Sequence, residues 1–265
     1  MKYLFLHVIG WTALVLFFYY NICYLIALIK RRNDVADIAW GPGFVIAALV
    51  PLFIQGVMID RSILVTTFVV IWAARLTLHI HHRSKNTDED FRYRMWRESW
   101  GRYFYIKTYL FVFLLQGTIL IFVVMPVIII NTYRGSGATF FDYFGILIWI
   151  IGFIFESISD VQLRNFLKQP ENKGKIMQSG LWRYSRHPNY FGEVLQWWGL
   201  FIIGLSVPHG WLGAVGPILI TLLITKVSGI PLLEKNMDGN LEFELYKKRT
   251  SIFFPIPPGW IIKQN

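Results

Sequence analysis

The chain has 265 residues, of which 55% are hydrophobic and 17% aromatic, and its mean hydropathy is +0.46. This composition excludes an ordinary soluble domain and predicts an all-α integral membrane protein. The net charge of +10 would suit a nucleic-acid-binding protein, but the basic residues lie between apolar runs. We therefore expect the lipid bilayer, and no nucleic acid, as the partner of that charge.

Seven apolar runs are about long enough to cross a hydrocarbon core roughly 30 Å thick. They predict a seven-transmembrane helix bundle with spans at 4–29, 35–58, 63–79, 104–130, 139–159, 189–205 and 211–227. If these spans alternate, 22 of the 26 lysines and arginines fall on one face of the membrane. Because cytoplasmic loops are the basic ones, the N-terminus is predicted outside and the C-terminus in the cytoplasm.

The N-terminal half offers few groups with obvious chemistry. Asp37 lies a turn inside the second predicted span. Histidines close the third span, but six in the whole chain are too few for a multi-histidine box, so we expect no metal site. The loop at 83–102, which contains Tyr93, interleaves arginines with aromatic residues. This pattern predicts either an interfacial helix on the headgroups or a lid over a site open to the cytosol.

The ionisable residues inside the spans share one depth. Glu156, Asp160 and Arg164 follow at intervals of four, which places them on one helical face. The in-span ionisable residues that fall in the cytoplasmic halves of their spans are Asp37, Arg75, Glu156, Asp160, Glu193 and Lys226. Because an unpaired charge in a bilayer is costly, this layer predicts a polar cavity open to the cytosol. Such a cavity suits an enzyme that combines a membrane-soluble substrate with a water-soluble cofactor.

The stretch at 185–193 leads from a cationic loop into the sixth predicted span. Pro188 suits the first position of a helix, so the backbone N–H groups of residues 189–191 are expected to be free at the positive end of the helix dipole. Such an end binds phosphate. Further donors surround it, on Arg183, Arg186 and His187.

Glu193 and Trp197 follow Asn189 at helical spacing, so the three side chains share one face. Together with the cationic helix end, this face predicts a cradle for an anionic cofactor that leads to an acid-bearing pocket. The alternative is that the arginines only anchor the helix at the headgroups while Glu193 pairs with Lys226.

These residues resemble a known signature. The Asn-aromatic-x-Gly-Glu sequence at 189–193, with Trp197 behind it, resembles the steroid 5α-reductase superfamily, and Asp160 with Arg164 is similar to its Asp-x-x-x-Arg. Further motifs resemble the bacterial branch of that superfamily, the DUF1295 family, over essentially the whole chain. They are Asp37-x-x-Trp40-Gly41, Glu89-Asp90-x-Arg92-Tyr93, Gly229-Ile230-Pro231-Leu232-Leu233-Glu234 and Tyr246-x-x-Arg249-Thr250.

The resemblance implies a seven-helix bundle in the bacterial inner membrane that binds NADPH from the cytosol. It would deliver hydride to an activated carbon–carbon double bond of a steroid-like or other lipophilic substrate. Asn189 and Glu193 would act at the nicotinamide end, and 160–258 would form the cofactor-binding half of a single transmembrane domain, 1–265. The other cofactor-binding residues would be Asp160, Arg164, Arg183, Arg186, His187, Tyr190, Trp197, Glu234, Tyr246 and Arg249.

Two features depart from the reductases. Their carbonyl-activating Glu and Tyr come from an N-terminal part without a matching motif here, so Asp37 and Tyr93 are candidates for that catalytic role by location. The sequence Arg186-His187-Pro188 is closer to the related isoprenylcysteine carboxyl methyltransferases, which bind S-adenosylmethionine at the equivalent place. A methyltransferase and a non-catalytic lipid-binding protein therefore stay as alternatives, and the oligomeric state is not indicated.

Overall fold

The computed structural model describes residues 2–56, 58–84, 89–135, 137–258 and 260, and the regular structure in these ranges is helical. The chain forms two compact units. The N-terminal unit comprises Met1–Gly137 and Gly204–Gly216, and the C-terminal unit comprises Ala138–Ile203 and Pro217–Asn265. The assignment of 1–265 to one transmembrane domain stays a prediction, as does the cofactor-binding role of 160–258.

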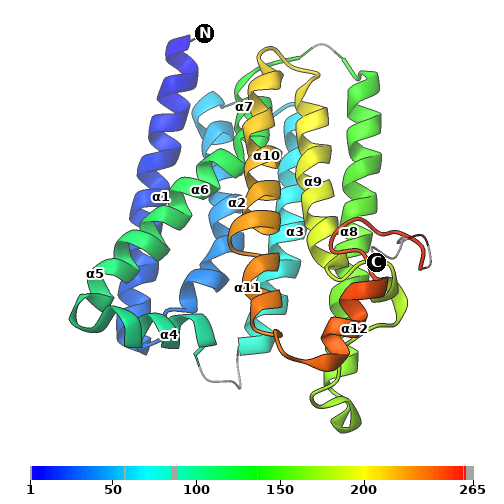
Figure 1. The fold of residues 1–265 in the computed structure, drawn as a ribbon. Coiled ribbons are helices and arrows are strands. Elements are labelled where there is room, and N and C mark those ends of the chain that lie inside the picture. The colour runs from blue at the N-terminus through cyan, green and yellow to red at the C-terminus, as the bar shows by residue number, and fades with distance from the viewer. Residues whose placement is uncertain (1, 57, 85–88, 136, 259, 261–265) are drawn as a thin grey trace. The chain divides into compact units, whose positions relative to one another are not determined.

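The N-terminal unit begins with three long helices, α1 (Lys2–Lys30), α2 (Val35–Gln55) and α3 (Asp60–Ser84). Helix α2 packs against both α1 and α3, as Figure 1 shows. Its buried face is made largely of small residues, which lets the neighbouring backbones come close: Ala36, Ala39, Gly41, Gly43, Ala47 and Ala48. The start of α2, which carries Asp37, is therefore held in a packed position.

The chain from 91 to 132 is a series of short helices. These are α4 (Phe91–Trp100), the 3₁₀-helix η1 (Gly101–Tyr103), α5 (Phe104–Thr108), the π-helix η2 (Tyr109–Leu114), α6 (Leu115–Val123) and α7 (Met125–Thr132). We predicted one span at 104–130, whereas the helix is interrupted at Val124. Pro126 explains the interruption, because its ring displaces the preceding turn and it has no N–H to donate. Helix α7 is buried throughout and packs on η5 (Gly210–Ala214).

The C-terminal unit is built on two long helices, α8 (Phe140–Leu167) and α9 (Pro188–Gly204). A capping box starts α8, with the Thr139 N–H donating to the Asp142 carboxylate at 2.7 Å. Helix α9 begins at Pro188, as predicted. The remaining elements are the 3₁₀-helices η3 (Pro170–Asn172) and η4 (Gly180–Arg183), α10 (Val215–Leu222), the π-helix η6 (Leu223–Val227), α11 (Ile230–Lys235) and α12 (Leu241–Arg249).

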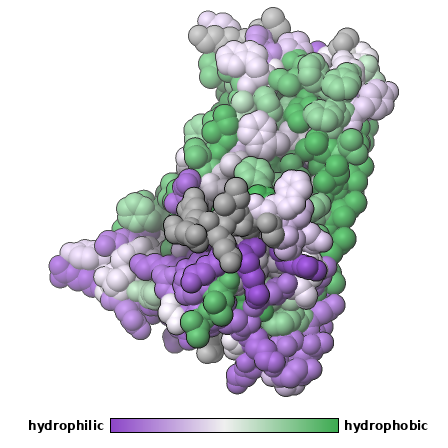
Figure 2. Space-filling view, turned by 45° about the vertical axis from the view of Figure 1, so that its right-hand side comes forward, coloured by the Kyte–Doolittle hydropathy of each residue, from purple (hydrophilic) through white to green (hydrophobic). Residues whose placement is uncertain are grey.

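Within the described ranges, six helical segments are long and apolar enough to cross a membrane: Tyr3–Lys30, Val35–Gln55, Asp60–Ser84, Arg92–Val123, Phe140–Leu167 and Gly210–Lys235. Along α8, exposed apolar side chains run from Phe140 to Val161, and the exposed Arg164 and Asn165 follow before Leu167. The surface seen in Figure 2 has hydrophobic side chains over much of its upper and right-hand part and hydrophilic ones gathered at its lower end. These segments support a multi-pass integral membrane protein. Helix α9, our sixth predicted span, has 17 residues and is not among the six, so the seven-span topology and its orientation stay predictions.

Helices α8 and α9 cross at glycines. A Cβ atom added to Gly192 would lie 2.5 Å from the Gly152 carbonyl oxygen, and one added to Gly145 would lie 2.6 Å from the Gly199 carbonyl oxygen. Only a residue without a Cβ atom permits these backbone approaches. Because the two glycines of each helix are seven residues apart, the approach occurs twice, in antiparallel register. We call this contact the α8–α9 seam.

The Gly192→Ala variant should lower the melting temperature of the purified protein by about 3–10 °C in a thermal unfolding assay. Overpacking costs roughly 1–3 kcal/mol, and each kcal/mol shifts Tm by roughly 2–4 °C in a chain of this size. The matched control is Gly10→Ala in α1, where no described atom lies within 4 Å of the added Cβ. The control should be as stable as wild type or more so. Equal melting temperatures for Gly192→Ala and wild type would contradict the close crossing.

Candidate functional site

The first turn of α9 holds Asn189 opposite Asp160 of α8. The Asn189 amide nitrogen donates to Asp160 Oδ1 at 3.2 Å. The side-chain oxygen of the same amide, Asn189 Oδ1, is buried and has no hydrogen-bond partner among the described residues. Because the carboxylate takes the donor end of the amide, the side-chain oxygen is left as an acceptor without a described donor.

The other predicted residues of α8 and α9 have contrasting exposures. Glu193 is half-buried one turn beyond Asn189, and Trp197 is buried a turn further along the same helix. Tyr190 stacks on His187 with ring centroids 5.8 Å apart. Arg164 is exposed near the end of α8. The side chains that we expected on one face thus run from a buried tryptophan toward the N-terminus of α9.

The backbone at the start of α9 differs from our expectation at one position. The N–H of Phe191 donates to the carbonyl of His187 at 3.1 Å, so it is not free to bind an anion. The reason is that the residue preceding the helix, although not helical itself, already accepts the first helical hydrogen bond through its carbonyl. The expectation of free N–H groups throughout residues 189–191 was therefore wrong for Phe191.

Arg186, His187 and Glu234 form a clamp. Arg186 Nε and Nη2 donate to the two carboxylate oxygens of Glu234 at 2.8 and 3.2 Å. Its Nη1 donates to the carbonyls of Thr250 and Lys247 at 3.0 and 3.2 Å. His187 Nε2 lies 3.0 Å from Glu234 Oε1. The clamp joins the start of α9 to α11 and α12, and the predicted cofactor contacts of its three residues stay predictions.

The C-terminal tail, which includes Ser251 and Phe253, is hydrogen-bonded to the segment that precedes α9. Ser185 Oγ donates to the carbonyl of Phe253 at 2.8 Å, and the Arg186 N–H donates to the carbonyl of Ser251 at 2.8 Å. The hydroxyl of Tyr246 donates to the carbonyl of Trp182 and lies 3.3 Å from that of Ser185. Burial raises the pKa of the Tyr246 hydroxyl, so it stays a protonated donor. Its internal contacts tie α12 to the loop before α9.

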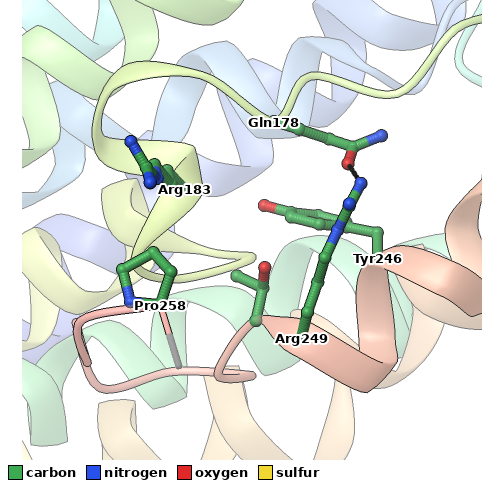
Figure 3. A pocket seen from close by; sticks show the side chains of 6 residues that line it. Gln178, Arg183, Tyr246, Arg249 and Pro258 are labelled. Atoms are coloured by element: carbon green, nitrogen blue, oxygen red, sulfur yellow. Dashed lines mark hydrogen bonds between the residues drawn. The ribbon is translucent and has the colours of Figure 1, made fainter. Parts of the chain in front are cut away.

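A cavity of about 290 Å³ lies where this loop, α12 and the tail meet. Its lining residues are Gln178, Arg183, Tyr246, Arg249, Thr250 and Pro258. Figure 3 shows Arg183 and Arg249 on opposite sides of the cavity, with Arg249 donating a hydrogen bond to the side-chain oxygen of Gln178. Both arginines are exposed. Because guanidinium groups bind phosphate through paired N–H donors, this cavity fits a phosphate-bearing ligand.

The N-terminal unit brings its two predicted residues together. The hydroxyl of Tyr93 donates to Asp37 Oδ1 at 3.1 Å, and Arg92 Nη2 donates to Asp37 Oδ2 at 2.7 Å. Tyr93 is 2% exposed. The structure thus places a phenol and a carboxylate, which are distant in sequence, in one hydrogen-bonded group oriented by an arginine.

Asp90 positions this group from the start of α4. Its carboxylate caps the helix by accepting from the Arg92 N–H at 3.0 Å, and it also accepts from Arg92 Nε at 2.9 Å. Burial alone would raise the pKa of Asp90, but these hydrogen bonds from Arg92 outweigh it and lower that pKa. Asp90 is therefore ionised at neutral pH, which holds Arg92 against Asp37.

The family model described as "Protein of unknown function (DUF1295)" matches residues 23–250. The chain belongs to the DUF1295 family. This DUF1295 protein is also similar to 3-oxo-5-alpha-steroid 4-dehydrogenase 1 of Bos taurus, at 41% identity over 71 residues, which are 27% of each chain. The protein of the same name from Homo sapiens is 36% identical over 63 residues, 24% of each chain.

A third relative is the very-long-chain enoyl-CoA reductase of Dictyostelium discoideum, 38% identical over 61 residues, which are 23% of the DUF1295 protein and 20% of the reductase. The chain thus spans about a quarter, or less, of the length of these three relatives. These similarities agree with the predicted membership of the steroid 5α-reductase superfamily. No solved structure matches the chain.

The sequence analysis did not single out three residues that lie at the candidate sites or in the α8–α9 seam of the DUF1295 protein. Arg92 was quoted only as part of a motif, although its position beside Tyr93 was the signal that could have found it. Gln178 lines the cavity from a loop without any motif. Gln196, which hydrogen-bonds Glu156 in the α8–α9 seam, follows Gly192 by one helical turn, and that spacing was the available signal.

The Arg186→Ala variant of the DUF1295 protein should lose on the order of 3 kcal/mol of stability, because it leaves the Glu234 charge largely buried without its main partner. Arg183→Ala is the matched control, since Arg183 is exposed and outside the clamp. Chemical or thermal unfolding in detergent measures both. A control as unstable as Arg186→Ala would show that the clamp is not what distinguishes these arginines.

Proposed function

We propose that this DUF1295 protein is a membrane-embedded reductase that uses NADPH to reduce an activated carbon–carbon double bond in a lipophilic substrate. The observation that carries the proposal is the buried side-chain oxygen of Asn189, Oδ1. Asp160 accepts from the nitrogen of the same amide, and the oxygen is an acceptor without a partner among the described residues. The names of the steroid dehydrogenases and the enoyl-CoA reductase among its relatives support a reductase of such bonds.

The residues of the C-terminal unit fit a nicotinamide dinucleotide. Its carboxamide carries N–H donors that match the Asn189 acceptor, and Glu193 lies one turn away on the same helix. Arg183 and Arg249 match its phosphates. NADPH has one phosphate more than NADH, which favours it at a cavity with two guanidinium groups. When bound, NADPH supplies the hydride.

Asp37 and Tyr93 fit the activation of a carbonyl group. When hydride adds to a double bond conjugated with a carbonyl, negative charge develops on the carbonyl oxygen, and a positioned O–H donor stabilises it. In the proposed reaction the Tyr93 hydroxyl turns its hydrogen bond from Asp37 to that oxygen. Arg92 keeps the carboxylate in place meanwhile.

Purified protein should bind NADPH, and Arg183→Ala or Arg249→Ala should weaken that binding about tenfold or more. A hydrogen bond to a charged group contributes roughly 1.5–3 kcal/mol, and 1.4 kcal/mol corresponds to a factor of ten in affinity. The loss should be smaller for NADH, which has one phosphate fewer. Isothermal titration calorimetry in detergent measures the dissociation constants, with Arg102→Ala, an exposed arginine of the N-terminal unit, as the control.

Binding of S-adenosylhomocysteine without binding of NADPH would replace the proposal with a methyltransferase. Binding of neither would favour a non-catalytic lipid-binding protein. Because phosphates are absent from S-adenosylhomocysteine, the two arginine variants would then leave its affinity unchanged.

The Tyr93→Phe variant should oxidise NADPH roughly 100-fold more slowly than wild type when supplied with a lipophilic enone such as a 3-oxo-4-ene steroid. Removal of one donor to a developing oxyanion typically costs about 10²–10³ in rate. NADPH affinity should be unchanged. The matched control is Tyr103→Phe, since Tyr103 is exposed. Wild-type turnover by Tyr93→Phe would remove the phenol from the proposed reaction.

A further inference from the structure

The α8–α9 seam contains a second carboxylate–amide pair that no predicted role uses. Gln196 Nε2 donates to Glu156 Oε2 at 2.6 Å. Gln196 is 1% exposed and Glu156 is 3% exposed. The pair repeats the arrangement of Asn189 and Asp160, with an amide of α9 donating to a carboxylate of α8.

Along α9 the two amides lie on either side of the closest backbone approach, whereas along α8 both carboxylates follow Gly152. Gly192, which contacts Gly152 and the backbone of Glu156, lies between Asn189 and Gln196 in α9. In α8 the two carboxylates are one turn apart. A slip of one helix past the other by a single turn would break both pairs and leave only one of the two amides opposite a carboxylate. It would also bring side chains against backbone where only glycine fits.

Apolar contacts alone define such a register poorly in a membrane, because lipid tails are as apolar as the side chains that they replace. Buried hydrogen-bonded polar pairs define it better, since each misplaced group is left without a partner in an apolar medium. A carboxylate facing an amide is also directional, because the carboxylate only accepts and the amide nitrogen only donates.

We propose that Glu156 and Gln196 are positioning residues that set the register of the α8–α9 seam and thereby hold Asn189 against Asp160. The consequence for the cofactor rests on the proposed function, whereas the coupling between the two side chains does not. Glu156 and Gln196 act here through Asn189 and need no contact with the cofactor.

An exchange of the two side chains tests this proposal. The variants Glu156→Gln, Gln196→Glu and the double variant with both changes are purified, and each is measured for melting temperature without ligand and for NADPH affinity. Glu98→Gln and Gln169→Glu are the matched controls, because they make the same changes at exposed positions. The controls should behave as wild type.

Each single variant should lower the melting temperature by at least about 3 °C and weaken NADPH binding at least about fivefold, Gln196→Glu more strongly because it brings two carboxylates together. The double variant restores one donor and one carboxylate. It should therefore recover most of both losses, which is the non-additivity expected of two side chains in contact.

Losses that simply add in the double variant would overturn the proposal. Recovery of the melting temperature with NADPH affinity unchanged in all variants would also overturn it, because the pair would then stabilise the fold without positioning the site. If Gln196→Glu yields no folded protein, recovery of folded protein in the double variant supports the proposal and its absence overturns it. If wild type does not bind NADPH, the proposed function fails, and the melting temperatures alone decide whether the pair sets the register.

Discussion

The ion pair between Arg186 and Glu234 is the interaction on which the C-terminal unit depends. Helices α11 and α12 have six and nine residues, and helices of this length are not stable in isolation. Arg186 reaches both of them from the start of α9, through the Glu234 carboxylate and through two backbone carbonyls near the end of α12. The guanidinium group of Arg186 therefore helps to fix the wall of the cavity that α12 forms, together with the hydrogen bonds of Tyr246.

The arginines of this unit fall into two kinds. Arg186 is buried, and its donors are directed to protein acceptors, so its charge is balanced inside the fold. Arg183 and Arg249 are exposed and line the cavity. The sequence alone does not distinguish the three arginines, which it would present as one cationic patch. The geometry separates them by the groups that they face, which is why stability and phosphate binding are expected to depend on different arginines.

Local signals in the sequence were sufficient for several elements. Pro188 predicted the first residue of α9, and apolar runs predicted the long helices α1, α2, α3 and α8, because proline geometry and hydropathy are properties of a few neighbouring residues. Pro126 was equally visible, yet the uniformly apolar sequence at 119–130 concealed the interruption at Val124.

Pairings over long sequence distances could not be predicted in this way. Arg186 and Glu234 are 48 positions apart, and Asp37 and Tyr93 are 56 apart. Each charged residue has many possible partners at such separations, and only the packing of the intervening helices selects one. The sequence thus indicated Asp37 and Tyr93 as candidate catalytic residues without indicating that these two share a hydrogen bond.

The glycine contacts of the seam also limit how such a protein can be altered. Because backbone meets backbone at Gly152 and Gly192, no side-chain volume is left there that could be enlarged or trimmed to move the helices. Changes that move these helices, whether evolved or engineered, would have to come from surfaces away from this contact. The seam is the part of the molecule to leave untouched in any redesign.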